Sequence, residues 1–434
     1  MEPSTIALII IVVTMVLYAT EYLPIAATSV MACLALAIFG VLPINGAFAG
    51  FGNDIVYLIV GMVIVGNALF ETGVAKLIGQ KIISAVGTNE RLFMLALVPV
   101  TTAISMFLSN TATASIVLPL VASAVAASGG KLTKKNTFMM VGILAVTGGG
   151  LTLVGSTPQL IAQGFLVDGG HGAMGFFEIA RTGLPILLLL VLYYQTIGLV
   201  LQKKFFTFPE VEDAPAVPAG GGSPTTVGVG TATIEEKPKS VAKMIISVCI
   251  LAFCIIGFLR DLWSPGVVAM VGAVACVATG CLSQKQLFAK MDWTTVTVMG
   301  ASFGISAGMQ QSGAGALVAQ TAINIMGDNV TPWLLWSTLV IISTILTNFM
   351  SSTATAALLV PIAGMLAIEL GFDVKPVVMA VAVAANVGYA TPVSTPPVTM
   401  TLVAGYRFKD YVVLGGLFNV LAIALLILIY PIVF

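Results

Sequence analysis

Two copies of one polar phrase contain the residue types in this chain that could bind small ions. The first copy reads Ser109-Asn110-Thr111-Ala112-Thr113-Ala114, and the second, 242 residues later, reads Ser351-Ser352-Thr353-Ala354-Thr355-Ala356. Each copy lies between two apolar segments and leads on to a proline, Pro119 or Pro361. Hydroxyl and amide groups in such surroundings need partners. We interpret both phrases as parts of a site for a bound solute.

The composition indicates an all-α polytopic membrane protein. Of the 434 residues, 58% are hydrophobic and only 8% are charged, whereas soluble domains have about 25% charged residues. The mean hydropathy is +1.07, and apolar runs of roughly 20 residues, each long enough to cross a bilayer, recur along the chain. The first run has neither a basic leader nor a cleavage site, so we expect a retained span. Nothing in the composition indicates a nucleic-acid partner.

The apolar runs predict membrane spans in two groups, separated by a polar segment. We expect spans at roughly 5–19, 24–42, 54–70, 137–166 and 176–202, and again at 244–259, 265–282, 293–309, 376–405 and 411–433. The segment 203–243 contains a Gly/Ser/Thr/Pro tract and predicts a flexible linker. The polar phrases interrupt two further apolar stretches, 92–128 and 332–370, which we interpret as re-entrant hairpins.

Other landmarks repeat in the same order as the phrases. Gly73 and Gly313 end similar segments 240 residues apart, and Gly155-Ser156-Thr157-Pro158 corresponds to Val393-Ser394-Thr395-Pro396 at an offset of 238. Such duplications are typical of secondary transporters. We therefore predict an N-terminal repeat (1–202), the linker (203–243) and a C-terminal repeat (244–434). Because each repeat has five spans, an odd number, the second repeat is inverted.

The distribution of basic residues predicts the orientation in a cytoplasmic (inner or plasma) membrane. With the linker in the cytoplasm, 15 of the 18 Lys and Arg residues lie inside, and only Arg181, Arg260 and Lys375 lie outside. Both termini are then extracytoplasmic. The first hairpin opens from the cytoplasm and the second from the outside.

Two of the predicted spans are broken. Their centres, 147–158 and 386–397, are rich in Gly, Pro, Ser and Thr, and irregular backbone inside a membrane is tolerated where it is buried or lines a cavity. Carbonyl and hydroxyl oxygens suit a small hard cation, and helix N-termini suit an anion. The alternative is that such stretches only pack helices closely; four of them in two symmetric pairs favour a binding site.

The charged residues limit the function classes further. Neither the phrases nor the broken centres contain Asp, Glu, Lys or Arg, so no fixed cation neutralises an anionic solute and a carboxylate proton relay has no parts. A co-bound cation supplies that charge, which favours Na⁺ over H⁺ coupling. The sequence has no nucleophile–base pair, metal-ligand cluster or phosphate-binding Gly-Lys motif, so we predict neither an enzyme nor an ATP-driven pump. The inverted hairpins argue against an ion channel.

The paired phrases and the downstream Gly155-Ser156-Thr157-Pro158 resemble the divalent anion/sodium symporter (DASS, Indy-type) family over residues 54–433. The resemblance implies a homodimeric elevator transporter, in which each protomer has a scaffold and a mobile transport domain. It implies Na⁺-coupled symport of a C4-dicarboxylate such as succinate, malate or fumarate. The alternatives are a Na⁺-independent exchanger, or a carrier of sulfate or citrate.

The resemblance also implies roles for individual residues. Substrate contacts are expected at Ser109, Asn110, Thr111, Thr157, Ser351, Ser352, Thr353, Thr395 and Pro396. One Na⁺ is expected at Ser105, Ser109, Asn110 and the backbone near Gly155, and a second at Thr347, Ser351, Thr353 and the backbone near Ser394. The chain departs from the family pattern at Ser352, where members usually have Asn. It also shows no counterpart of an additional N-terminal span that members commonly carry.

Overall fold

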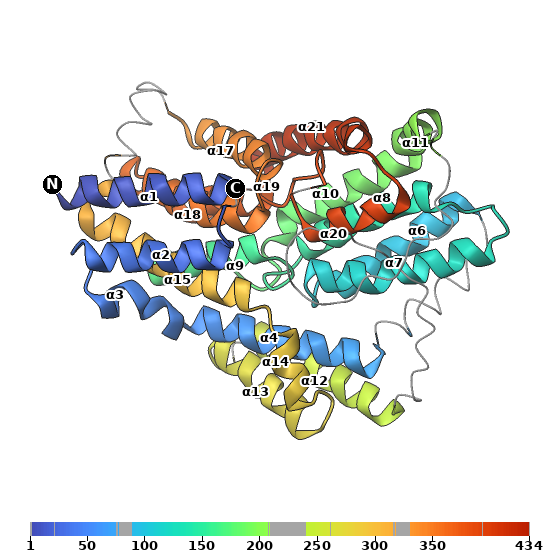
Figure 1. Cartoon of the computed structure of the whole chain (residues 1–434), viewed down its shortest axis with the longest axis horizontal. Coiled ribbons are helices and arrows are strands. Elements are labelled where there is room, and N and C mark those ends of the chain that lie inside the picture. The colour runs from blue at the N-terminus through green and yellow to red at the C-terminus, as the bar shows by residue number, and fades with distance from the viewer. Residues whose placement is uncertain are drawn as a thin grey trace.

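The protein is all-helical in the residues that the structure describes (Figure 1). The computed structural model describes residues 2–20, 22–74, 77, 89–206, 208, 240–260, 262–315, 317, 330–392 and 394–433. Most of the predicted linker, residues 207 and 209–239, lies outside the described residues.

The helices form two sets, one before and one after that segment, and corresponding helices occur in the same order in both sets. The first set is α1 (Pro3–Thr20), α2 (Ile25–Ile38), α3 (Ile44–Phe48), η1 (Ala49–Gly52), α4 (Asp54–Thr72), α6 (Glu90–Ser105), α7 (Asn110–Ala127), α8 (Lys134–Gly149), α9 (Thr157–Asp168), α10 (Ala180–Tyr193), the π-turn η2 (Tyr194–Gly198) and α11 (Leu199–Phe205). The second set is α12 (Val241–Leu259), α13 (Pro265–Ala278), α14 (Gln284–Lys290), α15 (Trp293–Ser312), α17 (Pro332–Thr347), α18 (Ser352–Glu369), α19 (Val374–Ala384), α20 (Pro396–Met400), η3 (Thr401–Ala404) and α21 (Phe408–Val433).

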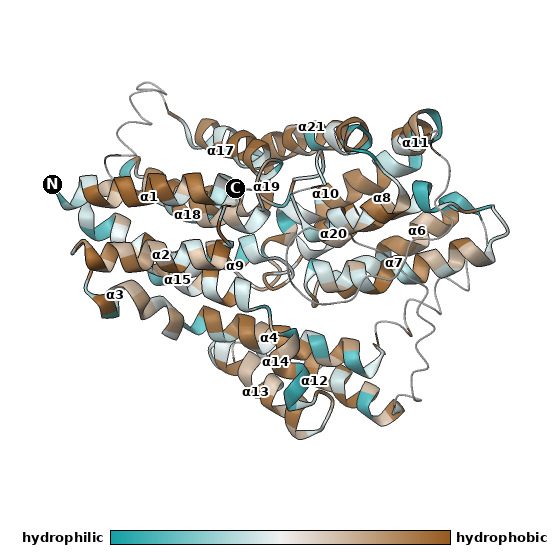
Figure 2. Cartoon of the chain, in the orientation of Figure 1, coloured by the Kyte–Doolittle hydropathy of each residue, from teal (hydrophilic) through white to brown (hydrophobic). Residues whose placement is uncertain are grey.

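Long apolar helices give the protein its membrane character. Five stretches of the described residues are long and apolar enough to cross a bilayer, at 54–72, 180–205, 241–259, 352–369 and 408–433. Apolar residues cover most helices, and polar colours gather at helix ends and in the loops between them (Figure 2).

Each polar phrase begins a helix. Ser109 is the N-cap of α7 and its side chain accepts a hydrogen bond from the Ala112 backbone N–H (3.3 Å); Ser351 does the same for α18 through Ala354 (3.2 Å). These caps satisfy amide groups that a helix start leaves free. The helix pairs α6–α7 and α17–α18 therefore turn at the phrases, where the sequence predicted the hairpin tips.

The two helix sets pack across each other. Helix α4 packs on α13, α15 packs on α2, α7 packs on α8 and α20, and α18 packs on α19 and α9. Helices α8 and α19 are buried along almost their whole length. The core therefore surrounds the two predicted breaks, which separate α8 from α9 and α19 from α20.

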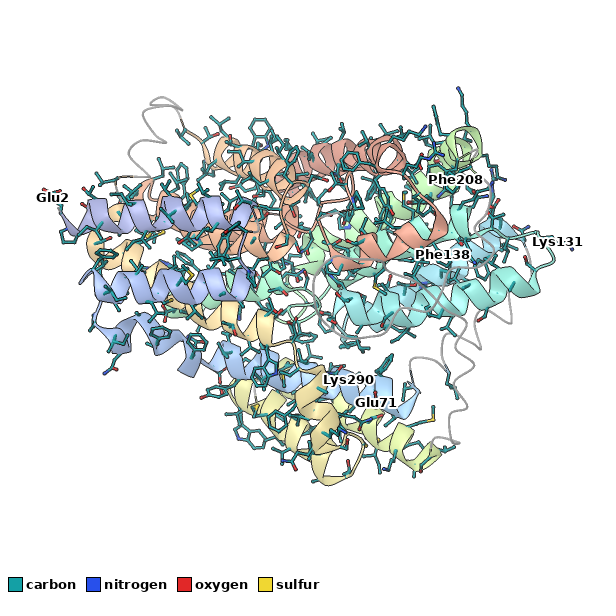
Figure 3. The ribbon with its side chains drawn as sticks, in the orientation of Figure 1. Glu2, Glu71, Lys131, Phe138, Phe208 and Lys290 are labelled. Atoms are coloured by element: carbon teal, nitrogen blue, oxygen red, sulfur yellow. The ribbon has the colours of Figure 1, made fainter. Side chains whose placement is uncertain are left out.

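Ion pairs join the two sets, and one of them lies beside the end of α4. The Glu71 carboxylate, at the end of α4, accepts hydrogen bonds from Lys290 and Gln286 of α14, and the Lys290 ammonium lies 4.6 Å from the centre of the Phe70 ring. Figure 3 shows Glu71 and Lys290 side by side.

Candidate functional site: two oxygen clusters at the hairpin tips

The first tip meets the first break in a cluster of oxygen atoms. The Ser105 hydroxyl donates to the Ala145 carbonyl oxygen. In the amide orientation that satisfies its neighbours, Asn110 Nδ2 lies 3.0 Å from both the Gly155 and the Ala145 carbonyl oxygens and 3.1 Å from Ser105 Oγ. Its two hydrogens can be donated to the two carbonyl oxygens. Turning the amide over directs Oδ1 at the same three oxygens. That second arrangement gathers four oxygen atoms, which is the kind of donor set that a hard cation prefers.

Glycine is required beside this cluster. A Cβ on Gly149 would lie 2.2 Å from the Asn110 amide atom that faces the cluster and 2.6 Å from the Gly155 carbonyl oxygen. A Cβ on Gly155 would lie 2.3 Å from the Gly149 carbonyl oxygen. The glycine run at the end of α8 therefore lets the Asn110 amide and the break approach each other closely.

The second tip forms a related cluster with the second break. The Thr347 hydroxyl donates to the Ala385 carbonyl oxygen (2.7 Å), as Ser105 does to Ala145. The Ser352 backbone N–H donates to the Ser394 carbonyl oxygen (3.2 Å), and the Ser394 hydroxyl donates to the Gly388 carbonyl oxygen. The second cluster thus contains hydroxyl and carbonyl oxygens but no amide at position 352.

Equivalent hydrogen bonds connect each tip to its break. The Thr152 hydroxyl donates to the Met106 carbonyl oxygen (2.5 Å), and the Thr391 hydroxyl donates to the Asn348 carbonyl oxygen (2.6 Å). The second tip has additional bonds: Asn348 Oδ1 accepts from the Ala390 backbone N–H (3.0 Å) and from Asn419 Nδ2 of α21 (3.1 Å).

The N-cap residues of the two helices that follow the breaks have nearly the same backbone conformation. Ser156, the N-cap of α9, has φ −149° and ψ 142°, and Thr395, the N-cap of α20, has φ −144° and ψ 139°. Gly155, the residue before the first cap, contributes its carbonyl to the first cluster. Ser394, the residue before the second cap, contributes its carbonyl to the second.

Comparison with known proteins identifies the family. The sequence profile of the citrate transporter family (CitMHS) matches residues 15–263 and 258–434. The chain belongs to this family. The resemblance to the divalent anion/sodium symporters is thereby confirmed, and the chain is a multi-pass integral membrane transporter and not an enzyme.

Several relatives match nearly the whole length of this family member. An uncharacterized transporter of Haemophilus influenzae is 28% identical over 95% of this chain and 88% of the relative. The sodium-dependent dicarboxylate transporter SdcS of Staphylococcus saprophyticus is 24% identical over 94% of this chain and 82% of its own. The sodium-dependent high-affinity dicarboxylate transporter 3 of Caenorhabditis elegans is 24% identical over 95% and 80%.

A solved structure shares the fold of the chain. The YdaH transporter of Alcanivorax borkumensis superimposes with a TM-score of 0.60, covering 89% of this chain and 87% of that protein at 12% identity. At that identity the likeness concerns the fold alone.

The predicted substrate residues of this family member lie at the two tips and the two breaks, and their side chains differ in solvent exposure. Ser109, Thr111 and Pro396 are exposed, whereas Asn110, Thr157, Ser351, Ser352 and Thr353 are half-buried. Thr395 is buried, and its hydroxyl oxygen has no partner among the described residues. The Ser109 and Ser351 hydroxyls, both predicted as cation ligands, also accept the helix-cap hydrogen bonds described above.

Sequence reasoning missed a set of polar contacts between the two breaks. The Ser156 hydroxyl donates to Asn386 Oδ1 (2.6 Å), and the Thr147 and Tyr389 hydroxyls lie 3.1 Å apart. All four residues occur in the glycine- and proline-rich centres that the sequence marked as broken. The sequence therefore locates the two broken segments, but it does not indicate which of their residues contact each other.

Proposed function

We propose that the protein is a secondary active transporter that couples Na⁺ to the symport of a divalent anion, most specifically a C4-dicarboxylate such as succinate, malate or fumarate. The observation that carries this proposal is the cluster of Ser105, Asn110, Ala145 and Gly155 at the first tip. Its three fixed oxygens converge on an amide that can present either a donor or a fourth oxygen.

The Asn110 amide gives the first cluster two self-consistent states. Without a cation, Nδ2 donates to the carbonyl oxygens and leaves none of them unsatisfied. When Na⁺ arrives, the amide turns its oxygen toward the ion, which then replaces the lost hydrogen bonds. The site therefore needs no carboxylate to remain stable when empty.

Helix starts and hydroxyl groups supply the anion site. Helices α7 and α18 begin at the two tips, and the positive ends of their dipoles favour a carboxylate. The side chains of Asn110, Thr353 and Thr395 offer hydrogen-bond donors, and the unpartnered Thr395 hydroxyl fits a ligand contact. Since no Lys or Arg occurs in these segments, bound Na⁺ provides the balancing charge. Substrate binding is then tight only when Na⁺ is present.

The names of relatives support the same solute class. Two relatives matched over at least 94% of this chain are described as sodium-dependent dicarboxylate transporters. The family description names citrate, which makes a tricarboxylate the first alternative substrate. Sulfate transport and Na⁺-independent exchange are the remaining alternatives.

We further propose the inverted-repeat organisation: repeats at 1–202 and 244–434, a cytoplasmic linker at 203–243, and extracytoplasmic termini. The hairpins (92–128 and 332–370) and broken spans (137–166 and 376–405) move together as an elevator against the remaining spans. Two such protomers form a homodimer. The matching helix order and the reciprocal packing of α7 on α20 and of α18 on α9 support this division.

The two hairpins differ in burial, as one-sided access requires. Helix α18 is buried along most of its length and also packs on α15, whereas Thr111, Ser115 and Ser123 of α7 are exposed. We infer that the anion site is reached along the first hairpin in this conformation. With the orientation predicted above, that side is the cytoplasm.

Transport by purified protein in liposomes tests the function. Uptake of radiolabelled succinate, malate, fumarate, citrate and sulfate is measured with an inward Na⁺ gradient and with choline replacing Na⁺. We expect Na⁺-dependent uptake of a C4-dicarboxylate. Equal uptake in choline would reject Na⁺ coupling, and uptake of citrate or sulfate alone would change the substrate. Uptake that requires internal dicarboxylate but not Na⁺ would indicate an exchanger.

Asn110→Ala tests the site itself. The substitution removes both the amide donor and the fourth oxygen, so Na⁺-dependent uptake is expected to fall to the level of protein-free liposomes. Full retained uptake would reject the assignment of the first cluster. Asn67→Ala is a suitable control, because Asn67 is half-buried on α4 and its amide bonds to the Lys290 carbonyl oxygen (3.0 Å) and not to an oxygen of either cluster.

A further inference from the structure

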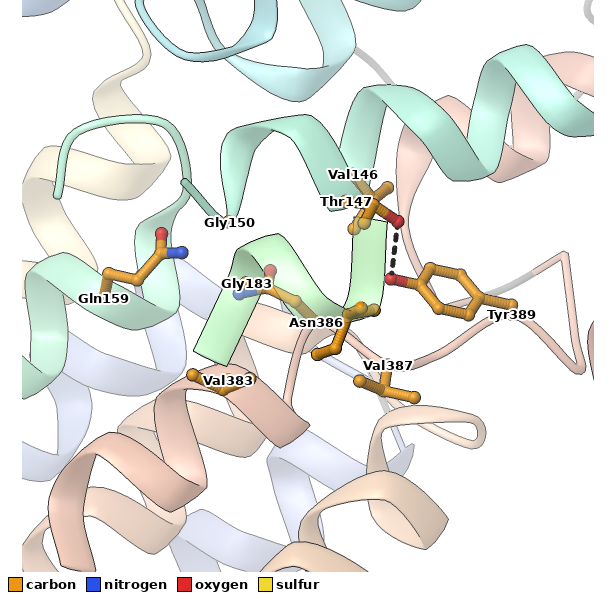
Figure 4. A pocket seen from close by; sticks show the side chains of 10 residues that line it. Val146, Thr147, Gly150, Gln159, Gly183, Val383, Asn386, Val387 and Tyr389 are labelled. Atoms are coloured by element: carbon orange, nitrogen blue, oxygen red, sulfur yellow. Dashed lines mark hydrogen bonds between the residues drawn. The ribbon is translucent and has the colours of Figure 1, made fainter. Parts of the chain in front are cut away.

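A pair of hydroxyl groups joins the part of the molecule proposed to move to the part proposed to stay fixed. Thr157 begins α9, directly after the first break, and Thr295 lies in the first turn of α15; their hydroxyl oxygens are 3.4 Å apart. By contrast, the Thr147 and Tyr389 hydroxyls, 3.1 Å apart, join the two breaks to each other and lie within the moving part (Figure 4). The contact between Thr157 and Thr295 is therefore one that an elevator movement has to break.

An acidic residue determines the direction of this hydrogen bond. Asp292 is the N-cap of α15: its Oδ1 accepts from the Thr295 backbone N–H (3.0 Å), and its Oδ2 accepts from the Thr295 hydroxyl (2.5 Å). Because a threonine hydroxyl has a single hydrogen, Thr295 Oγ1 faces Thr157 only as an acceptor. Thr157 is therefore the donor, and its hydroxyl hydrogen is engaged by the fixed part.

The three residues differ in solvent exposure. Thr295 is 7% exposed and Thr157 is half-buried, whereas Asp292 is exposed. A hydrogen bond is stronger where water is largely excluded, as it is at Thr295. Asp292 remains in contact with water, so its charge is not buried at a cost. The fixed part can therefore hold the Thr157 hydroxyl without placing an ionised group in the protein interior.

The corresponding place in the other helix set is built differently. Asp54, at the start of α4, and Asp292 are 238 residues apart, the offset that also relates Thr157 to Thr395. However, Asp54 accepts from the hydroxyl of Ser264, the N-cap of α13 (2.7 Å), and the buried Thr395 hydroxyl has no partner among the described residues. In this conformation the fixed part thus engages Thr157, and no equivalent bond engages Thr395 in the described part of the chain.

We propose that Thr295 and Asp292 compete with the substrate for the Thr157 hydroxyl, and are positioning residues that weaken anion binding in this conformation. Thr157 is one of the predicted substrate residues, and the inference rests on the proposed function. Its single hydroxyl hydrogen can be donated either to Thr295 or to a substrate carboxylate. Binding of the anion therefore breaks the bond across the boundary, and it removes a contact that holds α9 on α15.

The charge of Asp292 acts in the same direction. Its carboxylate lies two hydroxyl groups away from an anion that contacts Thr157, and like charges repel each other more strongly where water is excluded. Neither the polar phrases nor the broken centres contain Lys or Arg, so no fixed cation in these segments offsets the repulsion. Both the hydrogen bond and the charge therefore favour the empty site over the loaded site.

The contact itself is tested by a double-mutant cycle on thermal stability, which needs no substrate. The apparent melting temperature of the purified full-length protein is measured for Thr157→Val, for Thr295→Val and for the double variant. We expect the double variant to lose less than the sum of the two single losses, because each single change already removes the shared bond. Losses that add would overturn the contact, whatever the protein transports.

The competition is tested by equilibrium binding of radiolabelled succinate to the purified protein in saturating Na⁺. Thr295→Val is expected to bind succinate about threefold more tightly, the effect of one competing hydrogen bond, because Thr157 is then free to donate to the anion. Asp292→Asn should also bind more tightly, since it removes the charge while asparagine still caps the helix. Thr295→Ser keeps the hydroxyl and should bind as the wild-type protein does.

Ser264→Ala is the matched control, because it removes a hydroxyl–carboxylate bond between α13 and α4, both in the fixed part. It should lower thermal stability and leave succinate affinity unchanged. Unchanged or weaker binding in Thr295→Val, or an equal gain in Ser264→Ala, would overturn the competition alone. If the wild-type protein binds no succinate, the proposed substrate and the competition for it are both rejected, whereas the melting cycle still decides whether the hydroxyl contact exists.

Discussion

At the scale of single residues, the two polar phrases differ at one position, Asn110 in the first and Ser352 in the second. Asn110 reaches the Gly155 and Ala145 carbonyl oxygens through its amide. At the corresponding position, Ser352 bonds to Ser394 only through its backbone N–H. The second cluster therefore has no side-chain amide oxygen to offer a cation.

Ser352→Asn is expected to strengthen the second cluster. The longer amide can place an oxygen beside the carbonyls of Ala385 and Ser394, so the apparent Na⁺ affinity should rise several-fold in a Na⁺ titration of uptake. The reciprocal change, Asn110→Ser, gives the first cluster the composition of the second and should weaken Na⁺ affinity at least tenfold. Opposite directions in both variants would contradict the assignment of these clusters to Na⁺.

Gly149→Ala tests the close approach at the first cluster. The added Cβ would meet the Asn110 amide atom that faces the cluster at 2.2 Å and the Gly155 carbonyl oxygen at 2.6 Å, so Na⁺-dependent uptake should be lost. Gly416→Ala in α21 is the control, because the nearest atom to its Cβ would be 3.6 Å away. Alanine there favours the helix by about 1 kcal/mol, so uptake should be retained and the melting temperature should not fall.

At the scale of elements, the bounds of the helices on either side of the two phrases agree with the sequence prediction. The polar phrases lie at the starts of α7 and α18 because a serine with a free amide two or three residues later is a strong helix N-cap. The expected stretches 92–128 and 332–370 agree closely with α6–α7 and α17–α18. The end of α2 was predicted less well. The helix stops at Ile38 and not near 42, because Gly40 adopts a left-handed conformation (φ 73°) and Pro43 follows.

Contacts between the breaks could not be predicted from the sequence. Ser156 and Asn386 are 230 residues apart, and Thr147 and Tyr389 are 242 apart. Helix periodicity and capping signals act over a few residues, so they locate the breaks but do not pair their side chains.

The second tip has more hydrogen bonds to its surroundings than the first, which predicts that the two tips respond differently to the loss of one bond. Thr152→Val removes the hydroxyl bond to Met106 and leaves that carbonyl unsatisfied, whereas Thr391→Val removes the bond to Asn348, whose side chain still bonds to Ala390 and Asn419. Thr152→Val should therefore weaken apparent Na⁺ affinity more than Thr391→Val does. The two isosteric changes control for each other in one Na⁺ titration, and a larger effect at Thr391 would contradict this account.

At the scale of the whole molecule, each helix set completes the other. Helices α4 and α15 pack on α13 and α2 of the opposite set, while both breaks meet at the centre. In the proposed elevator, the boundary between moving and fixed parts runs between α9 and α15. The hydroxyls of Thr157 (α9) and Thr295 (α15) lie 3.4 Å apart across it.

A cross-link across that boundary tests the elevator directly. In a background without the five native cysteines, Thr157→Cys with Thr295→Cys should form a disulfide on oxidation, because the replaced oxygens are already close. Oxidation should abolish uptake, since the moving part is then held against α15, and reduction should restore it in the same sample. Comparing the two redox states of one variant separates immobilisation from any effect of losing the Thr157 hydroxyl.

The matched control lies within the part proposed to stay fixed. The hydroxyls of Thr72 (α4) and Ser247 (α12) are 2.9 Å apart and buried, so Thr72→Cys with Ser247→Cys should cross-link as readily. Because α4 and α12 do not move relative to each other in an elevator, oxidation of this pair should leave uptake unchanged. If the 157–295 cross-link forms and uptake continues, α9 does not slide along α15. If the 72–247 cross-link also stops uptake, motion is spread through both parts, and transport proceeds by a rearrangement other than a rigid elevator.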